Sequence, residues 1–142
     1  MRALLVAAAL TSITPQHGIA GARIGMSKPA VIRALGAPRD VQRGSNDFGK
    51  YLILVYPRVV VTFQSGATVT SLSTTAGSER TRGVGVGSTP AQVAARVPGA
   101  RCLTEAGYHH CYVGTWEPGR VVTDFALRRG RVARVTVGYV LD

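Results

Sequence analysis

Two cysteines and two neighbouring histidines carry the most reactive side chains of this chain. Cys102 and Cys111 are the only cysteines, and His109 and His110 stand directly before the second of them. Adjacent residues of a strand point to opposite faces, so the two imidazoles cannot easily share one metal ion. In a secreted chain, two cysteines most simply form one disulfide. We therefore expect a Cys102–Cys111 disulfide, and neither a metal site nor a cofactor.

A hydrolytic site is the least favoured interpretation of the same residues. It would need a nucleophile, a base and an orienting acid within hydrogen-bond reach. Glu105 lies near the two histidines, but no Gly-x-Ser-x-Gly elbow or metal motif accompanies them. The glycine-rich segment 83–87 lacks the Lys-Ser/Thr pair of a phosphate loop. We interpret the histidines as exposed loop residues and predict a protein that is not an enzyme.

Two similar segments of the chain must build the elements around these residues. Residues 22–38 (ARIGMSKPAVIRALGAP) align with residues 83–100 (GVGVGSTPAQVAARVPGA), so that Ser27 matches Thr89 and Gly36 matches Gly99. Serine and threonine suit helix N-caps, and glycine suits a helix C-terminus. Valine and leucine four residues apart give each short helix one apolar face. The pattern predicts two short helices.

Runs of β-branched and aromatic residues follow each predicted helix. They span residues 51–56, 59–63 and 69–73, and then 111–115, 121–127 and 132–139. Such runs, separated by glycine and proline, predict antiparallel meanders. The expected fold class is α+β: a tandem repeat of a short helix plus a three-stranded antiparallel meander, with the helices on one face of the sheet.

The N-terminus indicates bacterial export. Arg2 precedes the apolar run Ala3–Leu10, which is too short to span a bilayer. We assign residues 1–16 to a signal peptide, 17–76 to repeat unit one, 77–85 to a linker and 86–142 to repeat unit two. The cleavage point stays open, because Ala20-Gly21-Ala22 also fits the small-x-small rule. The expected location is extracellular, with no stable membrane anchor after cleavage.

The charge of the chain is strongly positive but spread out. The formal net charge is +10, and the basic residues are divided evenly between residues 1–79 and 80–142. A DNA-binding protein usually concentrates its charge on one element, so nucleic acid is not the expected partner. The densest group is Arg128, Arg129, Arg131 and Arg134 around one predicted hairpin. An alternative function is therefore the binding of acidic envelope polymers.

The favoured function is protein binding through an open sheet face. With Arg128-Arg129-Gly130 as a three-residue loop, Asp124 lies opposite Arg134 on that face, and Phe125 lies on the core face. Tyr112 and Trp116 fall on one side of a neighbouring strand. Aromatic residues and arginine are common anchors of protein interfaces. We expect Tyr112, Trp116, Asp124 and Arg134 to contact another secreted or envelope protein.

The segment IGMSKPAVIRALGAP resembles the Gly-Met-Ser/Thr-x-x-x-Val-x-x-x-x-Gly signature of two related groups. These are the outer-membrane-assembly lipoproteins of the SmpA/OmlA type, with one copy, and the secreted β-lactamase inhibitory proteins, with two. Two copies and an export signal favour the inhibitor group, and GARCLTEAGYHHC is similar to the place of its disulfide. The resemblance implies an inhibitor-like function. It departs at Pro57-Arg58, where the inhibitors present an acidic hairpin tip.

Overall fold

The computed structural model describes residues 11–141, and the apolar run 3–10 lies outside them. The described part contains two short helices, α1 (Lys28–Leu35) and α2 (Pro90–Arg96). Its strands are β1 (Ile13–Thr14), β2 (Gly18–Ile19), β3 (Ala22–Arg23), β4 (Asp40–Asn46), β5 (Gly49–Val55), β6 (Val60–Gln64), β7 (Ser71–Thr74), β8 (Arg80–Thr81), β9 (Val84–Gly85), β10 (Arg101–Glu105), β11 (Tyr108–Val113), β12 (Val121–Arg128) and β13 (Arg131–Tyr139).

One antiparallel sheet of eight strands runs through the molecule. Its order is β10-β11-β12-β13-β7-β6-β5-β4, so the strands after α1 and those after α2 join where β7 pairs with β13. The α+β class is confirmed. The expected number of strands is wrong, because four rather than three strands of this sheet follow each helix. The added strands, β4 and β10, are the two edges of the sheet, and most of their side chains are exposed. That the two units are a tandem repeat stays a prediction.

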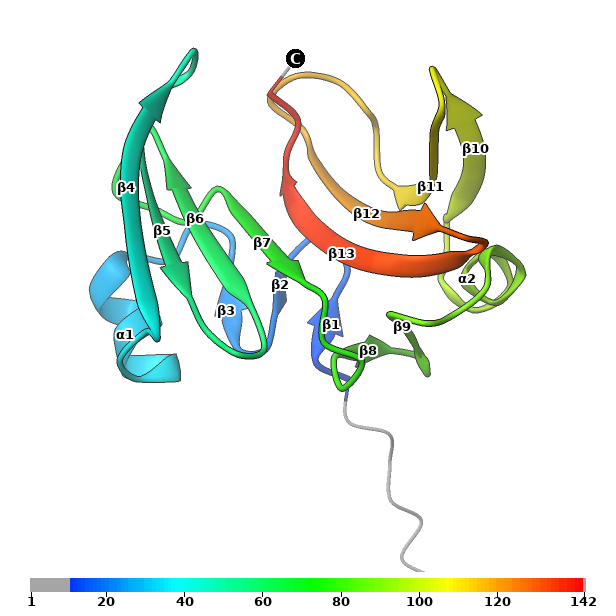
Figure 1. The fold of residues 1–142 in the computed structure, drawn as a ribbon, viewed down its shortest axis with the longest axis horizontal. Coiled ribbons are helices and arrows are strands. Elements are labelled where there is room, and N and C mark those ends of the chain that lie inside the picture. The colour runs from blue at the N-terminus through cyan, green and yellow to red at the C-terminus, as the bar shows by residue number, and fades with distance from the viewer. Residues whose placement is uncertain (1–10, 142) are drawn as a thin grey trace, which may run out of the picture.

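The sheet is strongly curved and only one of its faces carries the core. Figure 1 shows the strands bent into a trough, with both helices and the short strands β1, β2, β3, β8 and β9 on its convex side. Leu54, Val61, Leu72, Val137 and Phe125 point to that side and are fully buried together with Val31 of α1 and Val93 of α2. Alternate residues, such as Ser71, Ser73 and Thr136, face the concave side and are half-buried. The concave face is therefore open.

Both helices begin as the sequence predicts, and α1 also ends at the predicted glycine. The Ser27 hydroxyl accepts from the N–H of Ala30 at 3.3 Å, and Thr89 and Gln92 form a reciprocal capping box. Such side chains pair the free N–H groups of a first turn. Gly36 ends α1 with a φ of 81°, in the left-handed region that glycine tolerates best. In α2 the cap is Val97 instead, and Gly99 follows with a φ of 78°.

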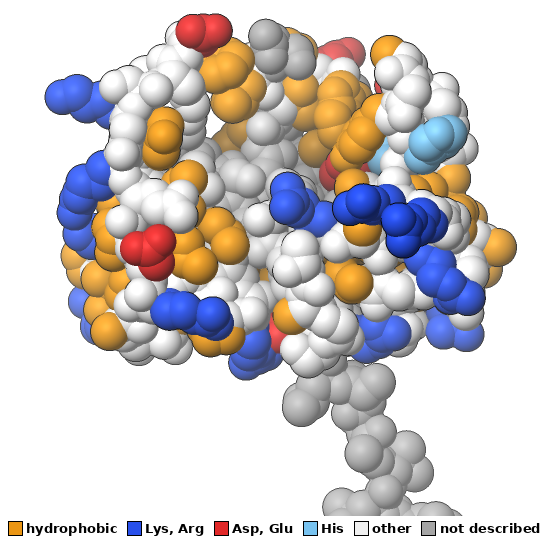
Figure 2. Space-filling view, viewed as in Figure 1, with side chains coloured by type: hydrophobic (Ala, Val, Ile, Leu, Met, Phe, Trp, Pro, Cys, Tyr) orange, Lys and Arg blue, Asp and Glu red, His pale blue; other side chains and the backbone are white. Residues whose placement is uncertain are grey.

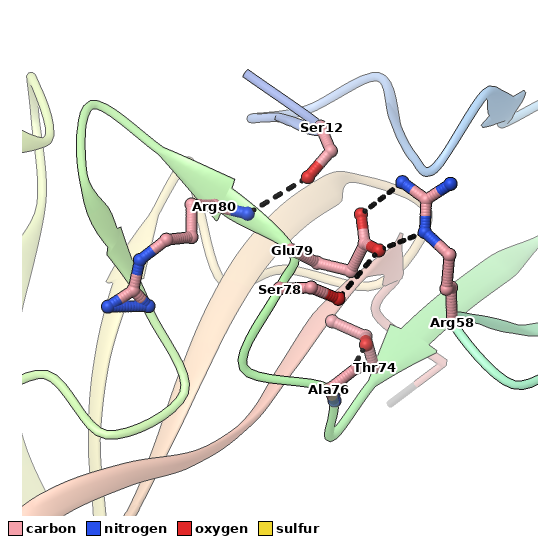
Figure 3. A network of polar contacts seen from close by, with 7 residues as sticks. All are labelled: Ser12, Arg58, Thr74, Ala76, Ser78, Glu79 and Arg80. Carbon is pink, nitrogen blue, oxygen red and sulfur yellow. Dashed lines mark hydrogen bonds and ion pairs between the residues drawn. The ribbon is translucent and has the colours of Figure 1, made fainter. Parts of the chain in front are cut away.

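The segment assigned to a linker, residues 77–85, is folded and holds a buried charge. Glu79 is fully buried, and its carboxylate accepts two hydrogen bonds from the Arg58 guanidinium (Figure 3). Burial alone would raise the Glu79 pKa, but the bonds from Arg58, Ser12 and Ser78 outweigh it and lower that pKa. Arg58 stands in the loop between β5 and β6 and is partly exposed, but its guanidinium is engaged by Glu79.

Residues 11–16, assigned to the signal peptide, also contact the folded part. Ile13 is fully buried in the core, and the Gln16 side chain donates to the carbonyl of Val121 at 2.7 Å. Ser12 accepts from the N–H of Arg80 at 3.0 Å. Cleavage after residue 16 would remove all three contacts. The cleavage position itself stays a prediction.

The expected disulfide joins the edge hairpin β10–β11. Cys102 and Cys111 lie directly opposite each other, with their Cα atoms 3.9 Å apart. The bond fixes β10, whose other edge is unpaired in the sheet, to β11.

Reduction of the disulfide is expected to lower the free energy of unfolding by about 2 kcal/mol. The chain-entropy model gives roughly 2.5–3 kcal/mol for so short a loop, and strand pairing already restrains the hairpin. Urea unfolding of the oxidised and reduced proteins would measure the difference. The Cys102→Ala/Cys111→Ala variant is the control, because its midpoint should not respond to reductant. Equal midpoints before and after reduction would contradict the expectation.

Candidate binding face

An aromatic cluster lines one wall of the concave face. Tyr108, His110 and Tyr112 are alternate residues of β11 and so share one face of the strand. The His110 ring centroid lies 4.5 Å from that of Tyr108 and 5.2 Å from that of Tyr112. Trp116 follows the strand and packs edge-on against His110 and Tyr112 at 5.1 and 5.4 Å. These four residues are called the aromatic cluster below.

His110 is the buried centre of this cluster. The side chain is 1% exposed, and its Nδ1 lies 2.7 Å from Oδ1 of Asp124 on β12. Among the described residues, its Nε2 atom has no hydrogen-bond partner. The interpretation of both histidines as exposed loop residues is therefore wrong for His110. It holds in part for His109, which is exposed on the same strand and lies 2.6 Å from the Thr104 hydroxyl.

Asp124 connects the aromatic cluster to the middle of the sheet. One carboxylate oxygen pairs with His110, and the other accepts the Tyr108 hydroxyl. Burial and this bond to the carboxylate raise the pKa of Tyr108 well above its usual range. The phenol therefore stays protonated and acts as a donor at physiological pH. Asp124 itself is buried, so it orients its neighbours rather than presenting a free charge.

A pocket of about 310 Å³ lies beside the aromatic cluster. Its lining includes three of the exposed large apolar side chains of the described residues: Trp116, Tyr139 and Leu141. Asp124, Thr136 and Ser71 are among the polar lining residues. Figure 2 shows the hollow of the concave face between its two walls, with apolar side chains along the rim. This lining combines exposed apolar area with a few polar groups, as binding sites commonly do.

The register expected between Asp124 and Arg134 is wrong. Asp124 pairs with Thr136, and Arg134 pairs with Ala126. Two features cause the difference: the turn is a two-residue loop of Arg129 and Gly130, with φ values of 53° and 75°, and a register shift between Ala126 and Leu127 moves the pairing by one further residue. Two positive φ values are typical of a type I′ hairpin turn. Phe125 does share the core face with Val135, as expected, and both are fully buried.

The candidate contact residues are brought together only in part. Tyr112 and Trp116 belong to the aromatic cluster, and Asp124 lies beside them on β12. Arg134 is exposed further along the concave side. Arg128, Arg129 and Arg131 surround the tip of the β12–β13 hairpin, and Arg131 donates to the carbonyl of Gly87 at 2.9 Å. Lys and Arg side chains gather over this end of the molecule in Figure 2.

Sequence reasoning missed Tyr108, His110 and Arg101. Arg101 lies on β10 opposite Tyr112, with its guanidinium carbon 5.2 Å from the ring centroid. The signal was the alternation of aromatic and imidazole rings at residues 108, 110 and 112, because alternate residues of a strand share a face. It was overlooked because the strand was expected to begin at Cys111.

Within residues 11–141, no group of three or more His, Cys, Asp or Glu residues could hold a metal ion. In the same range, no helix is long and apolar enough to cross a membrane.

The fold is similar to parts of two secreted proteins of known structure. One is an extracellular protein containing a SCP domain from Bacillus anthracis, with 12% identity and a TM-score of 0.55 over 82% of this chain and 44% of that one. The other is a cysteine-rich secretory protein from Staphylococcus aureus, with 11% identity and a TM-score of 0.52 over 91% and 48%. This chain thus spans less than half of either protein. At such identities the likeness shows the fold alone.

These comparisons correct the resemblance inferred from the sequence. These two solved structures are an SCP-domain protein and a cysteine-rich secretory protein, and neither is a β-lactamase inhibitory protein or an SmpA/OmlA-type lipoprotein. No family model and no curated protein matches the chain. The short glycine-methionine-serine signature therefore describes a local helix start, with its cap and its apolar positions, and does not identify a family.

Proposed function

We propose that this protein is a secreted, non-enzymatic module that binds another secreted or envelope protein with its concave sheet face. The observation that carries the proposal is the position of Trp116. This indole is 40% exposed, packs on the aromatic cluster and lines the adjacent pocket. Tryptophan and tyrosine are enriched among the residues that dominate protein interfaces. The extracellular origin of both structural neighbours supports the proposed location.

The partner that fits this face has an acidic surface and a protruding apolar side chain. The chain carries a net charge of +10, which attracts proteins of opposite charge and speeds their association. Arg101 and Arg134 flank the aromatic cluster, and Asp124, the nearest carboxylate, is occupied by Tyr108 and His110. The pocket beside Trp116 would receive the apolar side chain. In this proposal the chain is a tandem repeat, and each unit of one helix and its strands supplies one wall of the trough.

Crosslinking from the pocket would test this function. A photoreactive phenylalanine at Thr136, which faces the concave side and lines the pocket, should label one acidic protein in the culture medium of the host. The same group at Ile32, 37% exposed on α1, is the matched control and should not label it. Adding Trp116→Ala to the Thr136 probe should weaken binding of the identified protein at least tenfold, on the order of the loss of one aromatic anchor, because such anchors dominate interface energies.

Two outcomes would contradict the proposal. Equal labelling from positions 136 and 32 would show that the concave face has no special role. The second outcome is that the protein retains an acidic polymer instead, with binding that falls steeply as the salt concentration rises. That result would favour the alternative function, at the arginines of the β12–β13 hairpin tip. That tip offers Arg128 and Arg129 as exposed charges, and replacing both by alanine would then remove the binding while Trp116→Ala would not.

A further inference from the structure

The imidazole of His110 has one of its two nitrogen atoms paired and the other unpaired. Nδ1 faces the Asp124 carboxylate, which only accepts hydrogen bonds, so the network assigns the ring proton to Nδ1. Nε2 of the neutral ring then carries a lone pair. Among residues 11–141 no donor reaches this buried atom. An unpaired buried polar atom is costly, which makes it a candidate for a functional role.

A second carboxylate lies near Nε2. Oε2 of Glu105, on edge strand β10, lies 4.0 Å away, and its side chain is 68% exposed. That distance is too long for a hydrogen bond, but a rotation of a free glutamate side chain can shorten it. The other ionisable or charged groups around the ring are Asp124 on β12, Tyr108 and Tyr112 on β11, Arg101 above Tyr112, and Arg134 of β13 near Tyr108.

We propose that His110 is a proton-dependent positioning residue of the binding face. A proton taken from solvent occupies the lone pair of Nε2, and the new N–H donates to Glu105. The imidazolium is then held between two carboxylates, Asp124 on one side and Glu105 on the other. Glu105 in turn fixes the exposed end of the β10–β11 hairpin against the aromatic cluster. Histidine is the side chain whose charge ordinarily changes between pH 5 and 8.

The effect of this proton on partner binding rests on the function proposed above. Its direction follows from charge. Uptake of the proton adds a positive charge beneath the aromatic cluster. It also engages the Glu105 carboxylate, a free negative charge at the rim of the face when His110 is neutral. Both changes favour an acidic partner. Affinity is therefore expected to rise as the pH falls from 8 to 5.

The single tryptophan of the chain makes this testable without a partner. Trp116 packs edge-on against His110, and a protonated imidazole quenches indole emission more strongly than a neutral one. In the wild-type protein, emission should fall in one transition as the pH is lowered from 8 to 5. His109→Gln, on the exposed side of the same strand, should keep that transition, and His110→Gln should lose it. A flat wild-type profile, or an unchanged transition in His110→Gln, would overturn the proposal.

Glu105→Gln provides a second test on an exposed residue, which protects the experiment against misfolding of the His110 variant. In the wild type, the hydrogen-exchange protection of the β10 amides should rise roughly fivefold as the pH falls from 8 to 5, after correction for the intrinsic exchange rate at each pH. This size corresponds to the energy of a partly exposed charged pair. Glu105→Gln should abolish that gain while Trp116 emission still responds to pH. Equal gains in both proteins would show that Glu105 does not close on His110.

Binding of the crosslinked acidic protein across the same pH range separates this proposal from the function on which it rests. A Trp116 transition without any partner binding would retain the proton-dependent cluster and remove the proposed function. Binding through Trp116 that is equal at pH 8 and pH 5 would retain the function and overturn the role of His110.

Discussion

Arg58→Met is expected to lower the free energy of unfolding by about 3 kcal/mol at pH 7, because it leaves a buried carboxylate without its cation. Glu79 is fully buried, and Arg58 supplies its charged partner (Figure 3). The estimate is at the low end of the range for broken buried pairs, because the Arg58 side chain is 59% exposed and Ser78 still contacts the carboxylate. Urea unfolding at pH 7 would measure the change.

The pH dependence of this deficit has a definite sign. In the wild type, folding lowers the Glu79 pKa, so the unfolded chain binds the proton more readily. The stability that the carboxylate contributes is complete above its unfolded pKa of about 4.3 and is lost as the pH falls through the lower folded value. In Arg58→Met only desolvation and the serine hydroxyls act on Glu79, so the proton is bound more readily in the folded state. The difference between the two proteins should shrink as the pH falls from 7 towards 4.

The double variant Arg58→Met/Glu79→Gln is the matched control. A neutral amide at position 79 carries no buried charge, so this protein should recover part of the stability lost in Arg58→Met at pH 7. Its difference from Arg58→Met should disappear at low pH, where the carboxyl of the single variant is protonated. Equal stability of the single and double variants at pH 7 would mean that the buried charge does not cause the deficit.

Local chemistry made the helices predictable. The caps at Ser27 and Thr89 and the apolar positions at Val31 and Val93 act within one or two turns of chain, and each performs in the structure the role that its residue type indicates. The same holds for the core strands, whose β-branched runs match β5, β6, β12 and β13 to within a few residues. The disulfide was predictable too, because only one pairing of two cysteines exists.

The edges of the sheet and the register of its last hairpin were not predictable in this way. Strand β4 (DVQRGSN) is polar because most of its side chains are exposed, so it lacks the alternation by which strands are found in a sequence. The β12–β13 register depends on Arg129 adopting a positive φ, which arginine rarely does, and the choice between a two-residue and a three-residue loop moves every later pair.

The candidate site depends most on contacts between distant parts of the chain. Asp124 reaches His110 across a strand pair fixed by the whole sheet, and this bond decides which nitrogen of the imidazole is free. Composition alone could not distinguish His110 from the exposed His109 beside it. Their difference follows from strand alternation once β11 is known to begin at Tyr108, since neighbouring residues then face opposite sides of the sheet.

Asp124→Ala is expected to destabilise the protein by about 3 kcal/mol and to disorder the aromatic cluster. The carboxylate accepts from both His110 and Tyr108, and its removal leaves the buried Nδ1–H without an acceptor, while the partly exposed phenol can turn to water. An alanine also leaves a cavity beside Thr136. Urea unfolding would measure the loss. Trp116 emission should shift towards that of a solvated indole, because the ring against which it packs is no longer held.

Asp124→Asn separates geometry from charge in the same position. The amide oxygen can still accept from His110, so the loss of stability should be about half as large, and Trp116 should stay packed. The asparagine carries no negative charge to hold an imidazolium, so the pH transition in Trp116 emission should weaken even though the cluster is intact. Equal destabilisation by alanine and asparagine would mean that packing alone, and not the bond to His110, orders this wall of the binding face.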